Sequence, residues 1–141
     1  MINSTFTKED LTTKEAIGAV IYDAEWRVLM QDHVKLDFFT IPIWKVREWE
    51  NPDEVIRNEL FDEIGIKIIK FEKIAIQDWV YDYNWIKVKI RNHIYKILSR
   101  SWAIENKEPA KHRLVKFMTI DEIKKLPKIS DATRIFLSTL T

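Results

Sequence analysis

The segment from Trp44 to Ile66 constrains this chain most strongly, because it predicts one helix with a well-defined start and end. Asn51 is a favourable N-cap residue, and Pro52 suits the first position of a helix. Gly65 provides the left-handed conformation in which many helices end. Between these limits apolar residues recur at helical spacing, so one side of the helix is expected to be buried. These apolar residues are Val55, Ile56, Leu60 and Ile64.

The predicted helix also carries an acidic face made of Glu59, Asp62 and Glu63. Their spacing of three and four residues places the three carboxylates together on one side of the helix, where like charges repel. A solvated acidic face is the plainer interpretation of such a pattern. A divalent cation would offset the repulsion, since hard ions such as Mg²⁺ are held by a few carboxylate oxygens together with substrate phosphates.

The same segment resembles the Nudix box, a motif written G-x5-E-x7-R-E-U-x-E-E-x-G-U, in which U is a bulky aliphatic residue. Laid on this chain without gaps, the motif matches at Glu50, Glu59, Leu60, Glu63, Gly65 and Ile66. The chain departs from the motif at three positions. Trp44 stands in place of the opening glycine, Asn58 in place of the arginine and Asp62 in place of a glutamate. A weaker likeness extends over most of the chain, through the ranges 16–30, 40–42 and 106–117.

The resemblance implies a single α/β domain over residues 1–141, built as an α/β/α sandwich with a mixed β-sheet, in which residues 1–14 are expected to be poorly ordered. It also implies metal-dependent hydrolysis of a nucleoside diphosphate linked to another group. The short length favours conversion of a nucleoside triphosphate to a monophosphate and pyrophosphate. ADP-ribose, nucleotide sugars and dinucleoside polyphosphates stay open as substrates. The expected partner is therefore a small nucleotide.

The metal implied by the resemblance is Mg²⁺, with Mn²⁺ as an alternative. Its expected ligands are the side chains of Glu59, Asp62 and Glu63 and the backbone carbonyl of Ile43. Of these residues, Glu59 and Glu63 are also the expected catalytic residues, because the cation that they hold would activate water and neutralise the phosphates.

The resemblance gives supporting and substrate-binding roles to residues around this face. Glu50 and Asn58 are expected to support the site, although Asn58 lacks the charge of the arginine that it replaces. The expected substrate-binding residues are Glu108, Lys111 and His112, in a segment between two predicted elements.

Tryptophans stand at several positions where glycine is expected. The chain has 2 Gly and 6 Trp, whereas average glycine usage of about 7% would give a chain of this size roughly ten. Only Trp79 lies in an apolar, strand-like run. The others lie in predicted turns or in the loop before the helix: Trp26, Trp44, Trp49, Trp85 and Trp102. Two hypotheses follow. Either the gene uses UGA for glycine and the codon has been read here as tryptophan, or the tryptophans are genuine and the chain tolerates them, with its activity in doubt. Trp44, Trp49 and Asn58 together favour, as the competing function, a nucleotide-binding module without catalysis.

Composition narrows the remaining classes of function. A net charge of +1 gives no reason to expect binding to nucleic acid. The absence of cysteine excludes disulfides and thiolate metal sites. It also argues against the isoprenoid diphosphate isomerases that share the fold of the Nudix family. A chain without cysteine suits the cytoplasm, which is the expected location. No run of residues has the length and apolarity of a membrane span. A homodimer stays open.

The remaining pattern predicts strands and short helices on both sides of the box helix. A hairpin is expected over 16–22 and 27–31. His33, in the loop that follows, is expected to be exposed, with contact to a substrate phosphate as the alternative. Alternating or apolar runs predict one or two strands over 67–83, a strand over 86–98 and a strand over 114–118. Thr119, with Glu122 three residues later, predicts a capped short helix, and Ser130 predicts the start of the last helix.

Overall fold

The computed structural model describes residues 12–35, 37–83, 86–107, 109–110 and 112–140. Along this part of the chain, the elements are β1 (Thr12–Val20), β2 (Val28–His33), β3 (Phe38–Thr40), β4 (Ile43–Val46), α1 (Pro52–Ile64), β5 (Ile68–Tyr83), β6 (Ile86–Arg100), β7 (His112–Met118), α2 (Ile120–Lys124) and α3 (Asp131–Ser138). Of the segment 1–14, which was predicted to be poorly ordered, residues 1–11 lie outside the described part and residues 12–14 belong to β1.

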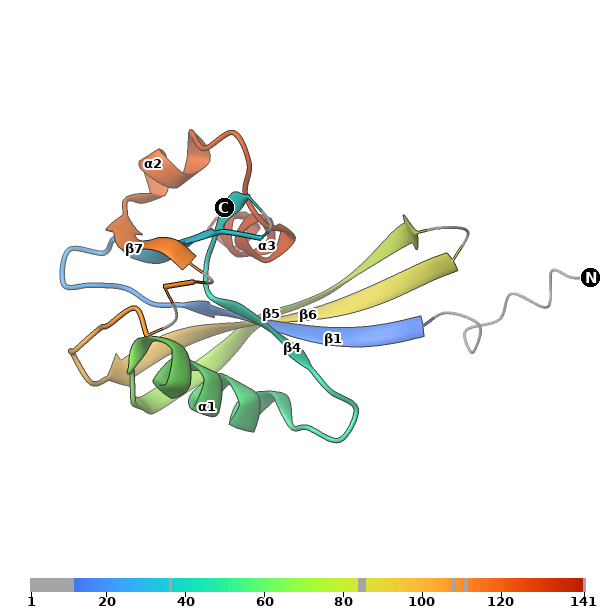
Figure 1. Ribbon diagram of the computed structural model, residues 1–141, viewed down its shortest axis with the longest axis horizontal. Helices are drawn as coiled ribbons and strands as arrows, with labels where there is room; N and C mark the ends of the chain where they lie inside the picture. Colours follow the sequence, from blue (N-terminus) through green and yellow to red (C-terminus); the bar gives the residue numbers. More distant parts are fainter. Residues whose placement is uncertain (1–11, 36, 84–85, 108, 111, 141) are drawn as a thin grey trace, which may run out of the picture.

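The strands form two sheets. The larger sheet has the order β4-β1-β6-β5, with β1 parallel to β6 and the other neighbours antiparallel. The smaller sheet is antiparallel and has the order β3-β2-β7. In Figure 1, α1 lies on one side of the long strands, and α2, α3 and the smaller sheet lie on the other side. The predicted α/β class with a mixed sheet is confirmed.

The predicted hairpin over 16–22 and 27–31 is correct only at its turn. Asp23 and Arg27 pair through the backbone, and Tyr22 forms an antiparallel bridge with Val28. Beyond this bridge the two strands separate, because β1 pairs with β4 and β6 while β2 belongs to the other sheet. The region 67–83 forms one long strand, β5.

Helix α1 has the start and end that its sequence predicts. The Asn51 side chain accepts a hydrogen bond from the Asp53 backbone N–H at 2.8 Å, and Gly65 follows the helix in the left-handed region at φ 75°. Ile56, Leu60 and Ile64 are fully buried against the larger sheet, and each such side chain stabilises the fold by about 1.5–3 kcal/mol. No helix in the described part of the chain is long and apolar enough to cross a membrane.

Helix α3 covers the opposite face of the larger sheet. The Ser130 side chain caps it by accepting from the Thr133 backbone N–H at 3.1 Å, as predicted. The helix lies close to β1 because Gly18 has no side chain. A Cβ atom at that position would lie 3.3 Å from the Ala132 Cβ and 3.0 Å from the Ile41 Cδ1. The predicted capping box of Thr119 and Glu122 is present at α2.

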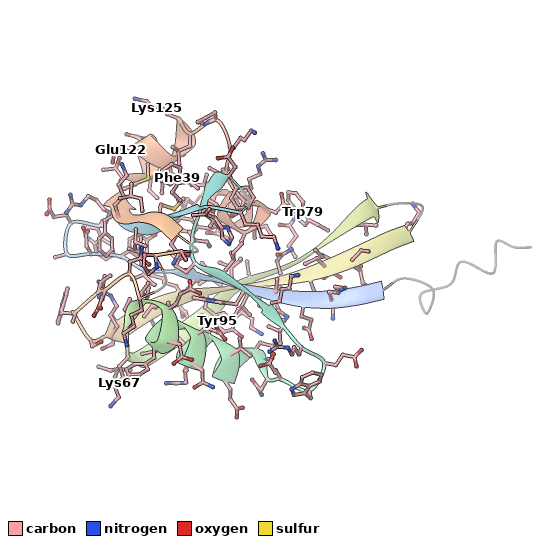
Figure 2. All side chains as sticks on the ribbon, in the orientation of Figure 1. Phe39, Lys67, Trp79, Tyr95, Glu122 and Lys125 are labelled. Atoms are coloured by element: carbon pink, nitrogen blue, oxygen red, sulfur yellow. The ribbon has the colours of Figure 1, made fainter. Side chains whose placement is uncertain are left out.

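The tryptophans fall into different environments. Trp26, Trp49 and Trp102 are 70%, 81% and 75% exposed, whereas Trp79 on β5, labelled beside α3 in Figure 2, is partly buried against the core cluster to which α3 contributes. Trp26 also has a left-handed backbone, with φ 63°. A bulky residue rarely adopts this conformation, so the turn at Trp26 has the geometry that the glycine hypothesis requires. Trp85 lies outside the described residues.

The left-handed backbone at position 26 predicts which of two substitutions there leaves the protein more stable. The Trp26→Gly and Trp26→Ala variants both lose the contact with the Tyr22 ring, whose centroid lies 5.5 Å from that of Trp26. We expect the glycine variant to be more stable than the alanine variant by about 1 kcal/mol in urea unfolding, because alanine keeps the steric cost of a positive φ. At Trp102, whose φ is not positive, alanine should be at least as stable as glycine. Equal stabilities at position 26 would contradict this account.

Candidate active site

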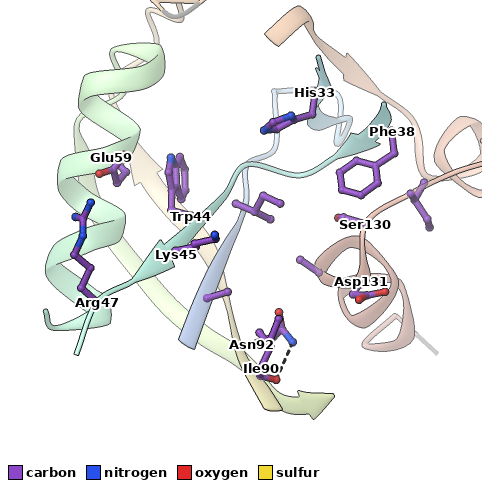
Figure 3. Close-up of a pocket in the computed structure, with 14 residues that line it drawn as sticks. His33, Phe38, Trp44, Lys45, Arg47, Glu59, Ile90, Asn92, Ser130 and Asp131 are labelled. Carbon is purple, nitrogen blue, oxygen red and sulfur yellow. Dashed lines mark hydrogen bonds between the residues drawn. The ribbon is translucent and has the colours of Figure 1, made fainter. Parts of the chain in front are cut away.

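A pocket of about 610 Å³ opens between α1, the larger sheet and the start of α3. Figure 3 shows Glu59, Trp44, Lys45 and Arg47 on one side of this pocket and Phe38, Ser130 and Asp131 on the other. Its volume is within the range of about 300–1,000 Å³ that is common for small-molecule sites. The pocket is therefore the first place to look for a ligand.

The pocket wall combines apolar, basic and amide groups. Phe38 contributes an aromatic ring, and Lys45 and Arg47 contribute positive charge on the side of the pocket that Glu59 also lines. Asn92 on β6 is buried, and its Nδ2 donates to the backbone carbonyl of Gln77 at 3.3 Å. Such a wall can hold a ligand with a flat, polar ring at one end and negative charge at the other.

Burial also affects an acid at the start of α3. It raises the pKa of the Asp131 carboxyl, and the nearby Arg134 opposes this shift. The protonated form of Asp131 is therefore favoured relative to that of a freely exposed aspartate.

Two contacts fix α1 against the larger sheet. Tyr95 on β6 faces the helix (Figure 2), and its hydroxyl donates to the Asp53 carboxylate at 2.5 Å. Burial and the neighbouring Asp53 raise the pKa of the Tyr95 hydroxyl, which therefore stays protonated as the donor. Arg57 lies over the Phe71 ring and donates to the Ile68 carbonyl at 3.2 Å. These contacts hold Arg57 on the β5 side of the helix.

Glu63 lies at the meeting point of α1 and both sheets. Its side chain is only 1% exposed. One carboxylate oxygen, Oε1, accepts from Nε2 of Gln31 on β2 at 3.1 Å. The other oxygen, Oε2, accepts from the indole Nε1 of Trp44 on β4 at 2.8 Å. Burial of a carboxylate is costly unless such donors compensate it, so these hydrogen bonds are part of what holds Glu63 in place.

The other predicted metal-site residues lie around this point but are not all brought together. Glu59 is partly buried and lines the pocket beside Trp44, whereas Asp62 and Asn58 are exposed. Ile43, whose carbonyl was the predicted backbone ligand, lines the pocket. Glu50 accepts from the Arg47 backbone N–H at 2.8 Å and closes the loop between β4 and α1.

No protein-family model and no curated protein matches this sequence significantly. Solved structures match it closely in shape. A MutT Nudix hydrolase from Burkholderia pseudomallei superposes with a TM-score of 0.77 at 22% identity, over 92% of this chain and 99% of that protein. The ORF135 protein of E. coli gives 0.74 at 17% identity, over 95% of this chain and 92% of that protein. The Nudix domain of Shewanella oneidensis NrtR, solved with ADP-ribose, gives 0.68 at 13% identity, over 100% of this chain and 94% of that one.

The chain has the Nudix hydrolase fold. Proteins of this fold typically use a divalent metal, but the arrangement around Trp44 does not fit one. Both oxygens of Glu63 already accept from N–H donors, and the buried Trp44 ring, which lines the pocket, stands at Oε2 where a cation from the pocket would have to bind. Within the residues that the structure describes, no three acidic or histidine side chains form a group that could hold a metal ion.

The predicted substrate-binding residues are only partly within the described chain. Glu108 and Lys111 lie outside it, and His112 is described only as the first residue of β7, opposite His33. The prediction that His33 is exposed was wrong. His33 ends β2, where it pairs with Phe38 of β3 and His112 of β7, and it is buried and lines the pocket.

Several pocket residues were not found from the sequence. Gln31 sits in an apolar strand, and a buried polar residue there is a signal that it has a partner, but its position does not reveal that the partner is Glu63. Lys45, Arg47, Asn92 and Asp131 come from separate elements. Their sequence spacing carries no sign that they meet.

The Glu63 carboxylate predicts a measurable coupling. Gln31→Leu should destabilise the fold by about 1–3 kcal/mol, because the buried oxygen of Glu63 loses its donor. In Gln31→Leu/Glu63→Leu both polar partners are gone, so the double variant should lose less than the sum of the single variants. Urea unfolding of Gln31→Leu, Glu63→Leu, the double variant and the unchanged chain gives the four free energies of unfolding that this double-mutant cycle needs. Strict additivity would show that the two side chains do not interact.

Proposed function

We propose that this fold serves the hydrolysis of a nucleoside diphosphate linked to another group, most directly of a nucleoside triphosphate to a monophosphate and pyrophosphate. The observation that carries the proposal is the pocket, which Glu59 of α1 lines together with Lys45 and Arg47. Cationic side chains can bind phosphates, and the aromatic and amide groups at the other end suit a base.

The acidic face is proposed as the metal site of the form that has glycine at position 44. There, Glu59, Asp62 and Glu63, with the Ile43 carbonyl, would be the oxygen ligands of Mg²⁺ or Mn²⁺, with Glu59 and Glu63 as the catalytic residues. Glu50 and Asn58 would support this face. Glu108, Lys111 and His112 are proposed to bind the substrate. Hard divalent cations favour such oxygen donors.

The identity of the group beyond the diphosphate is not determined by the pocket. Among the similar structures, one is a complex with ADP-ribose and another is an Ap4A hydrolase from C. elegans. ADP-ribose, nucleotide sugars and dinucleoside polyphosphates are therefore alternatives to a nucleoside triphosphate.

The contact between Trp44 and Glu63 favours a second candidate function for the chain with tryptophan at position 44. The Trp44 indole donates a hydrogen bond to the Glu63 carboxylate, which metal-dependent hydrolysis would need. The pocket itself stays open to a ligand. Such a chain would bind a nucleotide without hydrolysing it.

A substrate panel with Mg²⁺ separates the two functions. We expect Trp44→Gly to release phosphate or pyrophosphate from at least one nucleotide, because Glu63 is then free of the indole. Adding Glu63→Gln to this variant should lower kcat by about 100-fold or more, the scale on which catalytic groups act. Glu25→Gln, which changes an exposed carboxylate in the turn before β2, is the matched control and should leave the rate unchanged.

Two results would contradict the hydrolase. One is no turnover by the glycine variant with any member of the panel, and the other is turnover that Glu63→Gln does not reduce. Nucleotide binding by the unchanged chain in titration calorimetry, without product, would support the binding function for the tryptophan form.

A further inference from the structure

Glu63 is the one acidic side chain that is buried among the residues the structure describes. A carboxylate in such a place needs either a cation or well-placed donors. The structure supplies N–H donors from Gln31 and Trp44, at 3.1 and 2.8 Å. Neither donor carries a formal charge. These two neutral groups offset part of the cost of burying the Glu63 carboxylate, a cost that a bound cation could otherwise offset.

The indole of Trp44 is suited to this role for two reasons. Its N–H can donate but cannot accept, so it has no lone pair with which to bind a metal. Its ring is only 7% exposed and also lines the pocket. The ring therefore fills the space between the pocket and the Oε2 atom of Glu63.

A cation that enters from the pocket would have to displace this ring. The displacement would break the 2.8 Å hydrogen bond and remove the ring from the core cluster that contains Leu60 and Ile64. Trp49, in the loop between β4 and α1, provides a contrast, since it is 81% exposed and belongs to no buried cluster among the described residues.

We infer that the indole N–H of Trp44 takes the place of the divalent cation at Glu63, so that any nucleotide binding by this chain is independent of divalent cations. The inference rests on the proposed function for the location of the cation in the glycine form. It goes beyond that proposal by assigning the loss of the metal site to one side chain and one hydrogen bond.

Direct binding of Mn²⁺, followed by the electron paramagnetic resonance signal of the free ion, tests the inference without a substrate. The proteins are the unchanged chain, Trp44→Gly, Trp44→Gly/Glu63→Gln and the matched control Trp49→Gly. We expect Trp44→Gly to bind one Mn²⁺ about 10- to 100-fold more tightly than the unchanged chain, the scale on which groups around a metal site alter affinity. The double variant should lose this gain, and Trp49→Gly should behave like the unchanged chain.

The unchanged chain provides a test that does not depend on the folding of any glycine variant. Tight binding of one Mn²⁺ to it that is lost in Glu63→Gln would overturn the inference, as would ATP binding that requires Mg²⁺. Equal ATP affinity with Mg²⁺ and with EDTA would support it. A Trp44→Gly variant that binds Mn²⁺ but hydrolyses nothing would refute the hydrolase and leave the inference standing.

Discussion

The buried carboxylate of Glu63 is the contact on which the arrangement of the site depends. It lies on α1, and its two oxygens accept hydrogen bonds from β2 of the smaller sheet and β4 of the larger sheet. Its backbone carbonyl also accepts from the Lys107 N–H at 2.9 Å, which ties the segment after β6 to the end of α1. One residue therefore links the helix, both sheets and a late loop, and sets the side of the pocket that Glu59 lines.

The same contact competes with the metal-dependent chemistry proposed for this site. The two N–H donors on this carboxylate stabilise the junction, and the Trp44 ring that supplies one of them stands between the carboxylate and the pocket from which a cation would enter. Positions where a sequence departs from the rules of its own fold are informative, because such departures tend to fall at functional or strained sites. Here the departure is Trp44, which stands where the Nudix box has glycine. A glycine would leave the carboxylate one donor short and the pocket open toward it.

Local physics explains which parts of this molecule could be predicted from its sequence. Helix α1 was predictable because Asn51 and Gly65 act within a few residues of the helix ends. The left-handed backbone of Trp26 agrees with the expectation of glycine in that turn. The burial of His33 and the pairing of Gln31 with Glu63 were not predictable, since both depend on contacts between elements that are far apart in the sequence. The separation of β1 from β2 into different sheets has the same origin.

The most direct measurement of the central contact is the exchange of the Trp44 indole hydrogen with solvent, followed by nuclear magnetic resonance. The Trp44 signal can be assigned by its loss in Trp44→Phe. The account predicts that this hydrogen exchanges far more slowly than those of the exposed Trp26, Trp49 and Trp102, and that its signal shifts in Glu63→Gln. An indole hydrogen that exchanges as fast as the exposed ones, with a signal that Glu63→Gln leaves unchanged, would contradict the account.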